Sequence, residues 1–261
     1  MSCSIIGAVE PQPYATRRDA VKARGSAPGH ATLRRVRVLL LSNSGRPYLA
    51  HAKAELLDFL GAARRIGFVT AASLGDEDAY CETARAALAP EIFVEHLRWD
   101  RDPFPALSRV DAVFVGGGNT YALLRRLRQA GLLEPLRERA HAGLRYAGSS
   151  AGSNVAGPNI LTTNDWNVVG LTAFEALGLV PFNVNPHYLE TDPAMAAGSE
   201  TRDMRVAEYH VVRDNPVVGI EEGAMVRVEN GHAWVRGTAR AKLFRRGEAP
   251  VWVSAGAPLP L

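Results

Sequence analysis

The sequence has few cysteines, no long hydrophobic run and little excess charge. Its two cysteines, Cys3 and Cys81, form no disulfide framework, and no C-x-x-C pair offers a metal or redox site. No apolar run is long enough to cross a bilayer, so we expect no membrane partner. The net charge is +3, and much of the positive excess lies in the first 35 residues, which argues against a nucleic-acid-binding face. Together these absences favour a reducing, cytoplasmic setting.

Motifs for metals and cofactors are also missing. There is no H-E-x-x-H, no EF-hand loop and no cluster of histidines and carboxylates, so no catalytic metal is expected. The Gly-rich stretch "GGGNTY", beginning at Gly116, lacks the third glycine of G-x-G-x-x-G, and no Gly-Lys-Ser/Thr follows it. The sequence therefore predicts a protein that works without a nucleotide or any other cofactor.

The composition fits a globular protein. The chain has 261 residues, of which 47% are hydrophobic and 22% charged, enough for one large domain or two small ones. Residues 1–35 are poor in acids, rich in Gly, Pro and Ala, and have no hydrophobic segment of signal-peptide length. We interpret them as a disordered N-terminal extension and expect a single domain over residues 36–261.

The N-terminal two-thirds of the chain alternates between strand and helix patterns. Buried strands are predicted at 36–44, 65–73, 91–99, 111–120 and 144–148, and helices at 47–60, 76–89 and 121–143, the last one broken near Gly131. Such alternation predicts an α/β fold with a mostly parallel sheet and helices on both faces. After residue 216 the sequence is β-rich, with a hairpin turn at Asn230-Gly231.

A candidate nucleophile lies in "LRYAGSSAGSN", residues 144–154. A Gly/Ser-rich tract is often a flexible linker or a helix N-cap, but this one follows a predicted strand and contains G-x-S-x-G, the signature of a nucleophile elbow. Of its three serines, only Ser150 has glycine two positions before and two positions after it, at Gly148 and Gly152. The tight turn needs small residues at both places, so the spacing selects Ser150.

A serine nucleophile needs a base, and the chain has seven histidines. His187, in "FNVNPHY", follows a β-rich run and is expected at the carboxyl end of a strand, on the same rim as Ser150. The other six are predicted in the N-terminal tail, inside elements or beside a turn: His30, His51, His96, His141, His210 and His232. Position therefore favours His187.

The carboxylate that would orient the histidine is left open by the residues alone. Asp165 lies in a polar turn between Ser150 and His187, and Glu221 and Glu222 follow a strand that could reach the same rim. The flexible backbone of Gly116–Gly118 can turn N–H groups toward a developing oxyanion.

The order of several motifs resembles the peptidase E family. "LLLSNS", "VFVGGGNTYALL", "GSSAGSN", "LTTNDW", "NPHY", "ETR" and "EEG" follow one another as in these α-aspartyl dipeptidases, from about Val36 to the C-terminus. The resemblance implies a class I glutamine amidotransferase-like, flavodoxin-like fold and a serine peptidase that cleaves dipeptides with an N-terminal aspartate (Asp-X). We expect the protein to be a monomer or a small homo-oligomer.

The resemblance assigns roles to individual residues. It implies a catalytic triad of Ser150, His187 and Asp165, with Glu222 as the alternative third member. The implied oxyanion donors are the backbone N–H groups of Gly118 and Ala151. Arg202 is the implied partner of the substrate's aspartyl carboxylate.

Two departures from the family pattern stand out. Relatives often have Trp before the nucleophile, where this chain has Ser149, and the spacing from His187 to Arg202 is longer by about one residue.

Two alternative functions remain at this point. One is a cyanophycinase-like hydrolase of β-aspartyl-arginine, and the other is a non-catalytic ligand-binding protein on the same fold.

Overall fold

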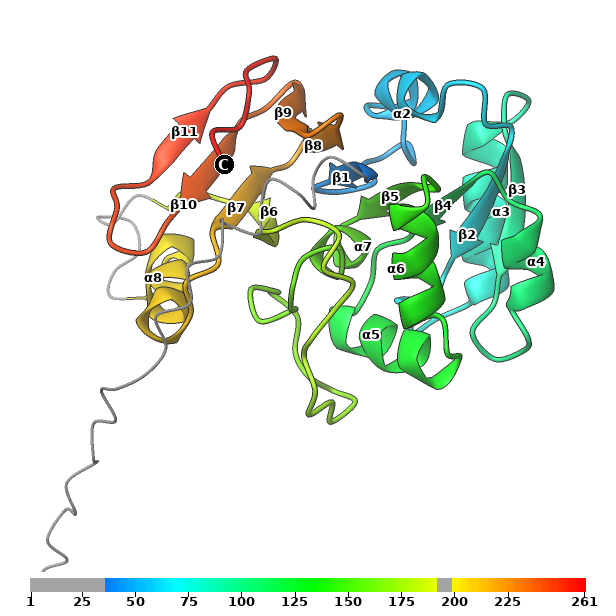
Figure 1. Cartoon of the computed structure of the whole chain (residues 1–261), viewed down its shortest axis with the longest axis horizontal. Helices are drawn as coiled ribbons and strands as arrows, with labels where there is room; N and C mark the ends of the chain where they lie inside the picture. The colour runs from blue at the N-terminus through cyan, green and yellow to red at the C-terminus, as the bar shows by residue number, and fades with distance from the viewer. Residues whose placement is uncertain (1–35, 192–198) are drawn as a thin grey trace, which may run out of the picture.

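The computed structural model describes residues 36–191 and 199–261, and a seven-stranded sheet forms its larger part (Figure 1). The predicted extension over residues 1–35 lies outside this range. The strands of the sheet are β1 (Arg37–Leu41), β2 (Arg65–Val69), β3 (Phe93–Leu97), β4 (Ala112–Val115), β5 (Arg145–Ser149), β8 (Ala224–Glu229) and β9 (His232–Gly237). Their order is β3-β2-β4-β5-β1-β8-β9, with parallel pairing from β3 to β1 and antiparallel pairing of β8 and β9.

Helices cover both faces of this sheet because its strands are apolar on both sides. They are α2 (Lys53–Leu60), α3 (Glu77–Leu88), α4 (Phe104–Ser108), α5 (Thr120–Gln129), α6 (Leu133–His141) and α7 (Ala151–Asn154). In β1, Leu39 and Leu41 pack with residues of α2 and α3, whereas Val38 and Leu40 belong to the core that contains α5 and α6. The predicted α/β class with helices on both faces is thus confirmed.

Two helix boundaries show how local backbone decides element length. The helix predicted from residue 47 begins only at Lys53, because Gly45 and Leu49 adopt left-handed φ angles of 67° and 58° that a helix does not accommodate. The break near Gly131 is present, with φ of 65° at the glycine between α5 and α6.

A second sheet lies beside the first (Figure 1). It contains β6 (Asn183–Tyr188), β7 (Val217–Glu221), β10 (Ala241–Phe244) and β11 (Val251–Val253) in the order β11-β10-β7-β6, and α8 (Arg202–Val212) packs against it. Val218 and Leu243 of this sheet belong to the same hydrophobic cluster as Val38 of the large sheet. The β-rich character after residue 216 predicted strands here, but not their assembly into a separate sheet.

The hairpin between β8 and β9 has the turn that its sequence predicts. Asn230 and Gly231 both have positive φ, 55° and 84°, as a two-residue turn with right-handed strand twist requires.

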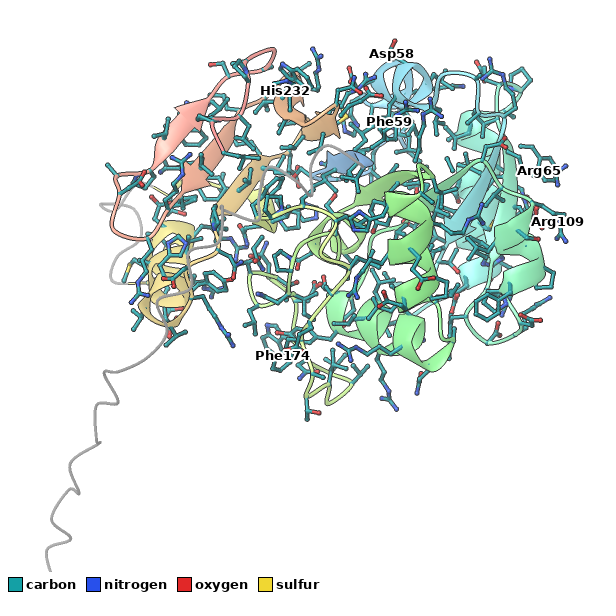
Figure 2. The ribbon with its side chains drawn as sticks, in the orientation of Figure 1. Asp58, Phe59, Arg65, Arg109, Phe174 and His232 are labelled. Atoms are coloured by element: carbon teal, nitrogen blue, oxygen red, sulfur yellow. The ribbon has the colours of Figure 1, made fainter. Side chains whose placement is uncertain are left out.

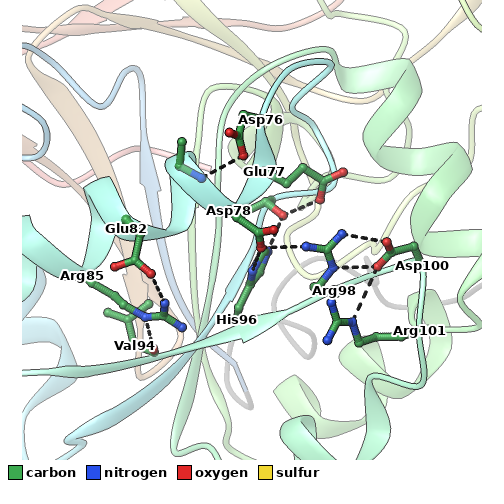
Figure 3. Close-up of polar contacts among 12 residues, drawn as sticks. Asp76, Glu77, Asp78, Glu82, Arg85, Val94, His96, Arg98, Asp100 and Arg101 are labelled. Atoms are coloured by element: carbon green, nitrogen blue, oxygen red, sulfur yellow. Dashed lines mark hydrogen bonds and ion pairs between the residues drawn. The ribbon is translucent and has the colours of Figure 1, made fainter.

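Helix α3 is fastened to β3 at the outer edge of the sheet by a group of polar contacts (Figure 3). Arg98 donates to Asp78 and to Asp100, each at 2.7 Å, and Arg85 Nε donates to the Val94 carbonyl at 3.0 Å. Asp76 caps the start of the helix by accepting the Ala79 N–H. These contacts hold the loop after β2 in place, and that loop lies against the Gly-rich loop described below.

Within the described part of the chain, no helix is both long and apolar enough to cross a membrane.

The core predicts a clear contrast between two substitutions. Phe114 of β4 is 1% exposed and its ring lies 5.4 Å from that of Phe68, so Phe114→Ala should lower the free energy of unfolding by about 3–5 kcal/mol. Leu74, 59% exposed, is the control: Leu74→Ala should change it by less than about 0.5 kcal/mol. Urea denaturation measures both, and equal effects would contradict this description of the core.

Candidate active site

Three side chains at the ends of three strands form a continuous hydrogen-bonded chain. Ser150 follows β5, His187 lies near the end of β6, and Glu222 follows β7. The Ser150 hydroxyl lies 2.8 Å from His187 Nε2, and His187 Nδ1 lies 3.0 Å from Glu222 Oε1. This arrangement of hydroxyl, imidazole and carboxylate is that of a nucleophile, a general base and a group that orients the base.

The turn that carries Ser150 is strained and tightly packed. Ser150 has φ 52° and ψ −108°, a region that costs a non-glycine residue about 1–3 kcal/mol. A Cβ at Gly148 would overlap the backbone of Gly152, and a Cβ at Gly152 would overlap the Val115 carbonyl of β4. The two glycines on which the sequence argument rests are therefore required by contacts with the neighbouring backbone.

The neighbouring serines have other partners. Ser149 is fully buried and its hydroxyl lies 2.8 Å from that of Ser44. Ser153 is also buried, and its hydroxyl contacts the carbonyls of Leu41 at 2.7 Å and Gly148 at 2.8 Å. Among the three serines, Ser150 alone has a described histidine at its hydroxyl.

The backbone around His187 also aims its side chain. The pairing of β6 with β7 shifts register between Asn185 and Tyr188, and His187 itself has φ 53°. Such a bulge redirects a side chain out of the regular alternation of a strand. The His187 N–H donates to Ser42 Oγ at 2.9 Å, and Ser42 donates to the Ile220 carbonyl at 2.8 Å. Ser42 was not singled out by the sequence analysis, although a polar residue directly after a buried strand was a usable signal.

None of the other described histidines is hydrogen-bonded to Ser150, although His51 lies near Glu222. His96 Nε2 is 2.8 Å from the Thr70 hydroxyl, and His210 Nε2 is 3.1 Å from the Asn215 carbonyl. Burial lowers the pKa of His51, against the opposing effect of the nearby Glu222 charge. His30 lies outside the described residues.

Asp165 is engaged with the Gly-rich loop rather than with His187. Its Oδ2 accepts the Thr120 N–H at 2.7 Å and the Thr163 hydroxyl at 3.1 Å. Thr120 is the first residue of α5, so the carboxylate caps that helix directly after the GGGN loop. The hydrogen bonds of the described residues include none between Asp165 and His187. The geometry thus separates the two carboxylates, with Glu222 at the histidine and Asp165 at the helix.

The N–H groups of the Gly-rich loop have internal acceptors at four of five positions. Gly116 donates to the Val69 carbonyl, Gly117 to the Tyr80 hydroxyl, Asn119 to the Ala72 carbonyl and Thr120 to Asp165, all between 2.7 and 2.9 Å. Gly118 is the exception within the described part of the chain. It has φ 137°, and a Cβ there would overlap the Ala72 carbonyl, so the position requires glycine.

The second candidate donor is next to the nucleophile. Ala151 is the first residue of α7, where a helix leaves its N–H groups without intrahelical acceptors. Gly117 lies close by, since a Cβ on it would be 3.2 Å from the Ser150 Cβ. The Gly-rich loop and the elbow are therefore adjacent, as an oxyanion site between Gly118 and Ala151 requires.

A cavity of about 350 Å³ lies between α8 and residues 161–164, and Asn185 of β6, two positions before His187, also lines it. Its lining includes Thr162, Asn164 and Asn185 on one side and Arg202 and Arg205 of α8 on the other. Burial, with a smaller contribution from the Arg205 charge, lowers the pKa of Arg202. Arg205 Nε lies 3.3 Å from Glu200, whereas no described carboxylate lies within 4.0 Å of the Arg202 guanidinium. Arg202 is therefore a suitable partner for an anionic group entering the cavity.

The described residues contain no group of three or more His, Cys, Asp or Glu side chains arranged to hold a metal ion.

The model of peptidase family S51 matches residues 38–236. The chain belongs to this family. A protein named peptidase E from Streptomyces coelicolor is 46% identical over 226 residues, covering 85% of this chain and 93% of that protein. A probable α-aspartyl dipeptidase from Drosophila melanogaster is 46% identical over 215 residues, covering 80% and 89%. The S51 fold is also found in a solved structure, a putative peptidase E from Listeria monocytogenes, with a TM-score of 0.59, 23% identity and coverage of 85% and 99%.

The close packing of the S51 elbow predicts that Gly152→Ala is strongly destabilising. The added methyl group must push against the Val115 carbonyl of a central strand, so the free energy of unfolding should fall by about 1–3 kcal/mol. Gly75, whose added Cβ would meet only the Ser73 hydroxyl at 3.9 Å, is the matched control. Chemical denaturation of both alanine variants tests this, and the packing argument fails if Gly152→Ala is as stable as Gly75→Ala.

Proposed function

We propose that this chain is a serine-type dipeptidase that hydrolyses peptides with an N-terminal aspartate. The names of its relatives, peptidase E and α-aspartyl dipeptidase, support the activity. The single observation that carries the mechanism is the chain of contacts from Ser150 through His187 to Glu222, at 2.8 and 3.0 Å. A ligand-binding protein without catalytic activity would not need this chain or the strained backbone at Ser150.

In the first half of the reaction, Ser150 attacks the carbonyl carbon of the aspartyl residue. His187 Nε2 accepts the hydroxyl proton as the new Oγ–C bond forms. The carbonyl oxygen becomes an oxyanion, which the N–H groups of Gly118 and Ala151 stabilise. His187 then gives the proton to the leaving amine as the C–N bond breaks, so the second amino acid departs and an aspartyl ester remains on Ser150.

In the second half, water takes the place of the amine. His187 accepts a proton from the water as its oxygen attacks the ester carbon, and the oxyanion forms again at the same two N–H groups. When the ester bond breaks, the proton passes to Ser150 Oγ and free aspartate leaves. Over the cycle the Ser150 proton leaves with the amine and a proton from water replaces it, so Ser150 and His187 return to their starting states, and no cofactor takes part.

Glu222 is the third member of the proposed triad. Its carboxylate accepts from His187 Nδ1, which leaves Nε2 free to act on Ser150. Asp165 serves catalysis indirectly, because it holds the start of α5 and hence the loop that carries Gly118. The sequence analysis placed Asp165 in the triad and held Glu222 as the alternative; the contact of Glu222 with His187 supports the alternative, and the contacts of Asp165 give no support to the first choice.

Arg202 is the proposed partner of the aspartyl side chain. Its guanidinium lines the cavity, and its planar fork suits bidentate contact with a carboxylate. A neutral side chain in that place would leave a partly buried charge unpaired, so discrimination should be strong. The substrate partner is thus a small peptide, and the cytoplasmic setting and the monomeric or small oligomeric state remain predictions.

The decisive test is Ser150→Ala. The variant should keep the fold, because the hydrogen bond from Ser150 to the Leu41 carbonyl is made by the backbone N–H, which alanine retains. Its kcat/KM for Asp-Leu should fall by at least about a thousandfold. Release of leucine measures the rate, and β-aspartyl-arginine is assayed in parallel. Normal turnover by Ser150→Ala rules out the mechanism, and a preference of the wild-type enzyme for β-aspartyl-arginine favours the cyanophycinase-like alternative.

A pair of isosteric substitutions separates the two carboxylates. Glu222→Gln removes the charge beside His187 and should lower kcat about a hundredfold. Asp165→Asn retains an oxygen that can accept the Thr120 N–H, so it should lower kcat by about tenfold or less. Steady-state kinetics on Asp-Leu compares the two variants. A larger loss in Asp165→Asn than in Glu222→Gln would return Asp165 to the triad.

A further inference from the structure

A buried ammonium group lies in the second sheet, away from the reacting atoms. Lys242 of β10 has a side chain that is only 7% exposed. Its Nζ lies 5.8, 5.6 and 5.0 Å from the ring centres of Tyr188, Phe244 and Trp252. An ammonium enclosed by aromatic faces gains cation–π attraction but loses water, so it persists only with charged partners.

Those partners are two carboxylates from separate segments of the chain. Lys242 Nζ donates to Glu190 at 2.7 Å and to Asp203 at 2.8 Å, and the Tyr188 hydroxyl also donates to Asp203. Burial alone would lower the pKa of Lys242, but these hydrogen bonds outweigh it and raise the pKa above its usual value. Lys242 is therefore a permanent positive charge in this cluster.

The same group connects the two segments that carry proposed functional residues. Tyr188 directly follows His187 at the end of β6, and Asp203 directly follows Arg202 in the first turn of α8. Lys242 thus connects the end of β6, which carries His187, to the first turn of α8, which carries Arg202. Its contact with α8 is the hydrogen bond to Asp203, and its contact with β6 is with the Tyr188 ring.

The two segments depend on this tie to different degrees. His187 has other supports: its N–H bonds Ser42, its ring bonds Glu222, and β6 pairs along β7. In the first turn of α8, the Asp203 carboxylate accepts from Lys242 and Tyr188, while the Thr201 hydroxyl accepts the Met204 N–H of the helix itself. Loss of the ammonium should therefore move Arg202 far more than His187.

We propose that Lys242 is a positioning residue for substrate recognition, which through Asp203 holds Arg202 where it meets the aspartyl carboxylate. This inference rests on the proposed function and goes beyond it by assigning a role to a residue that touches neither the substrate nor the triad. The sequence analysis had no signal for it, because Lys242 sits in a β-rich run without a recognisable motif.

Lys242→Met and Lys242→Arg test the proposal. Met keeps an unbranched apolar side chain without the charge, so Lys242→Met should raise KM for Asp-Leu about tenfold and leave kcat within about threefold. Lys242→Arg restores a cation and should recover most of the lost affinity. Direct binding of Asp-Leu to Ser150→Ala and to Ser150→Ala/Lys242→Met, by calorimetry, should show the same tenfold difference without any turnover.

Arg227→Met is the matched control for removing a partly buried, paired cation. Arg227 is 14% exposed, bonds Glu55 at 3.0 Å and Glu229 at 2.9 Å, and lies over the ring of Phe59. Figure 2 shows that Phe59, on α2, lies apart from α8. Its loss should lower stability while KM for Asp-Leu stays within about twofold of wild type. A rise in KM equal to that of Lys242→Met would mean that general loss of stability, and not the tie, causes the effect.

A double-variant comparison of Lys242 and Asp203 is the second test of the proposal. If the tie runs through Asp203, then Asp203→Asn should also raise KM, and the double variant with Lys242→Met should raise it no further than the larger single effect. Additive effects on KM overturn the proposal, as does a wild-type KM in Lys242→Met or a loss confined to kcat.

If Lys242→Met does not fold, Asp203→Asn and Lys242→Arg decide by the same KM criterion. Failure of the proposed function is recognised separately, because the wild-type enzyme would then not hydrolyse Asp-Leu.

Discussion

The site depends on the absence of side chains where the β5–α7 turn crosses the neighbouring backbone. Gly148 packs on Gly152, and Gly152 packs on the Val115 carbonyl of β4, so the turn cannot relax away from the sheet. The Ser150 N–H bonds the Leu41 carbonyl of β1, which fixes the turn from the other side. Held between two central strands, Ser150 keeps a backbone conformation that it would not adopt alone, and the hydrophobic core supplies the stability that offsets the strain.

The same sheet edge brings the remaining groups together. The loop after β4 carries Gly118. Its conformation is fixed by hydrogen bonds from the neighbouring N–H groups, notably from Gly117 to the Tyr80 hydroxyl and from Thr120 to Asp165. Because those donors are occupied, the loop can present Gly118 to a developing oxyanion without reorganisation. The second sheet contributes the base, from β6, and its carboxylate, which follows β7, so the proposed active site combines groups from both sheets.

The sequence predicted those parts of the structure that local chemistry determines. Alternating strand and helix patterns predicted the class of fold, and the glycine spacing around Ser150 singled it out as the candidate nucleophile, because both reflect short-range constraints. The sequence did not decide whether Asp165 or Glu222 contacts His187. The answer depends on which of two polar loops lies next to the histidine in the folded chain. The late start of α2 was missed for a related reason: left-handed backbone at Leu49 leaves no mark in hydrophobic periodicity. The Lys242 cluster joins residues up to 64 positions apart, from Tyr188 to Trp252 (252 − 188 = 64), and has no motif at all.

The contact between His187 and Glu222 is open to solvent, and this decides what it contributes. The histidine side chain is 40% exposed and the glutamate 66%, so as an ion pair the contact is worth no more than about 1 kcal/mol of stability. Its value lies in orientation instead, because a carboxylate at Nδ1 selects the tautomer in which Nε2 can accept the Ser150 proton. A bound peptide that covers the pair would exclude water and strengthen its electrostatic effect on the imidazolium. The proposed triad therefore adds little to the stability of the free protein, and its proposed role in catalysis depends on a bound peptide that covers it.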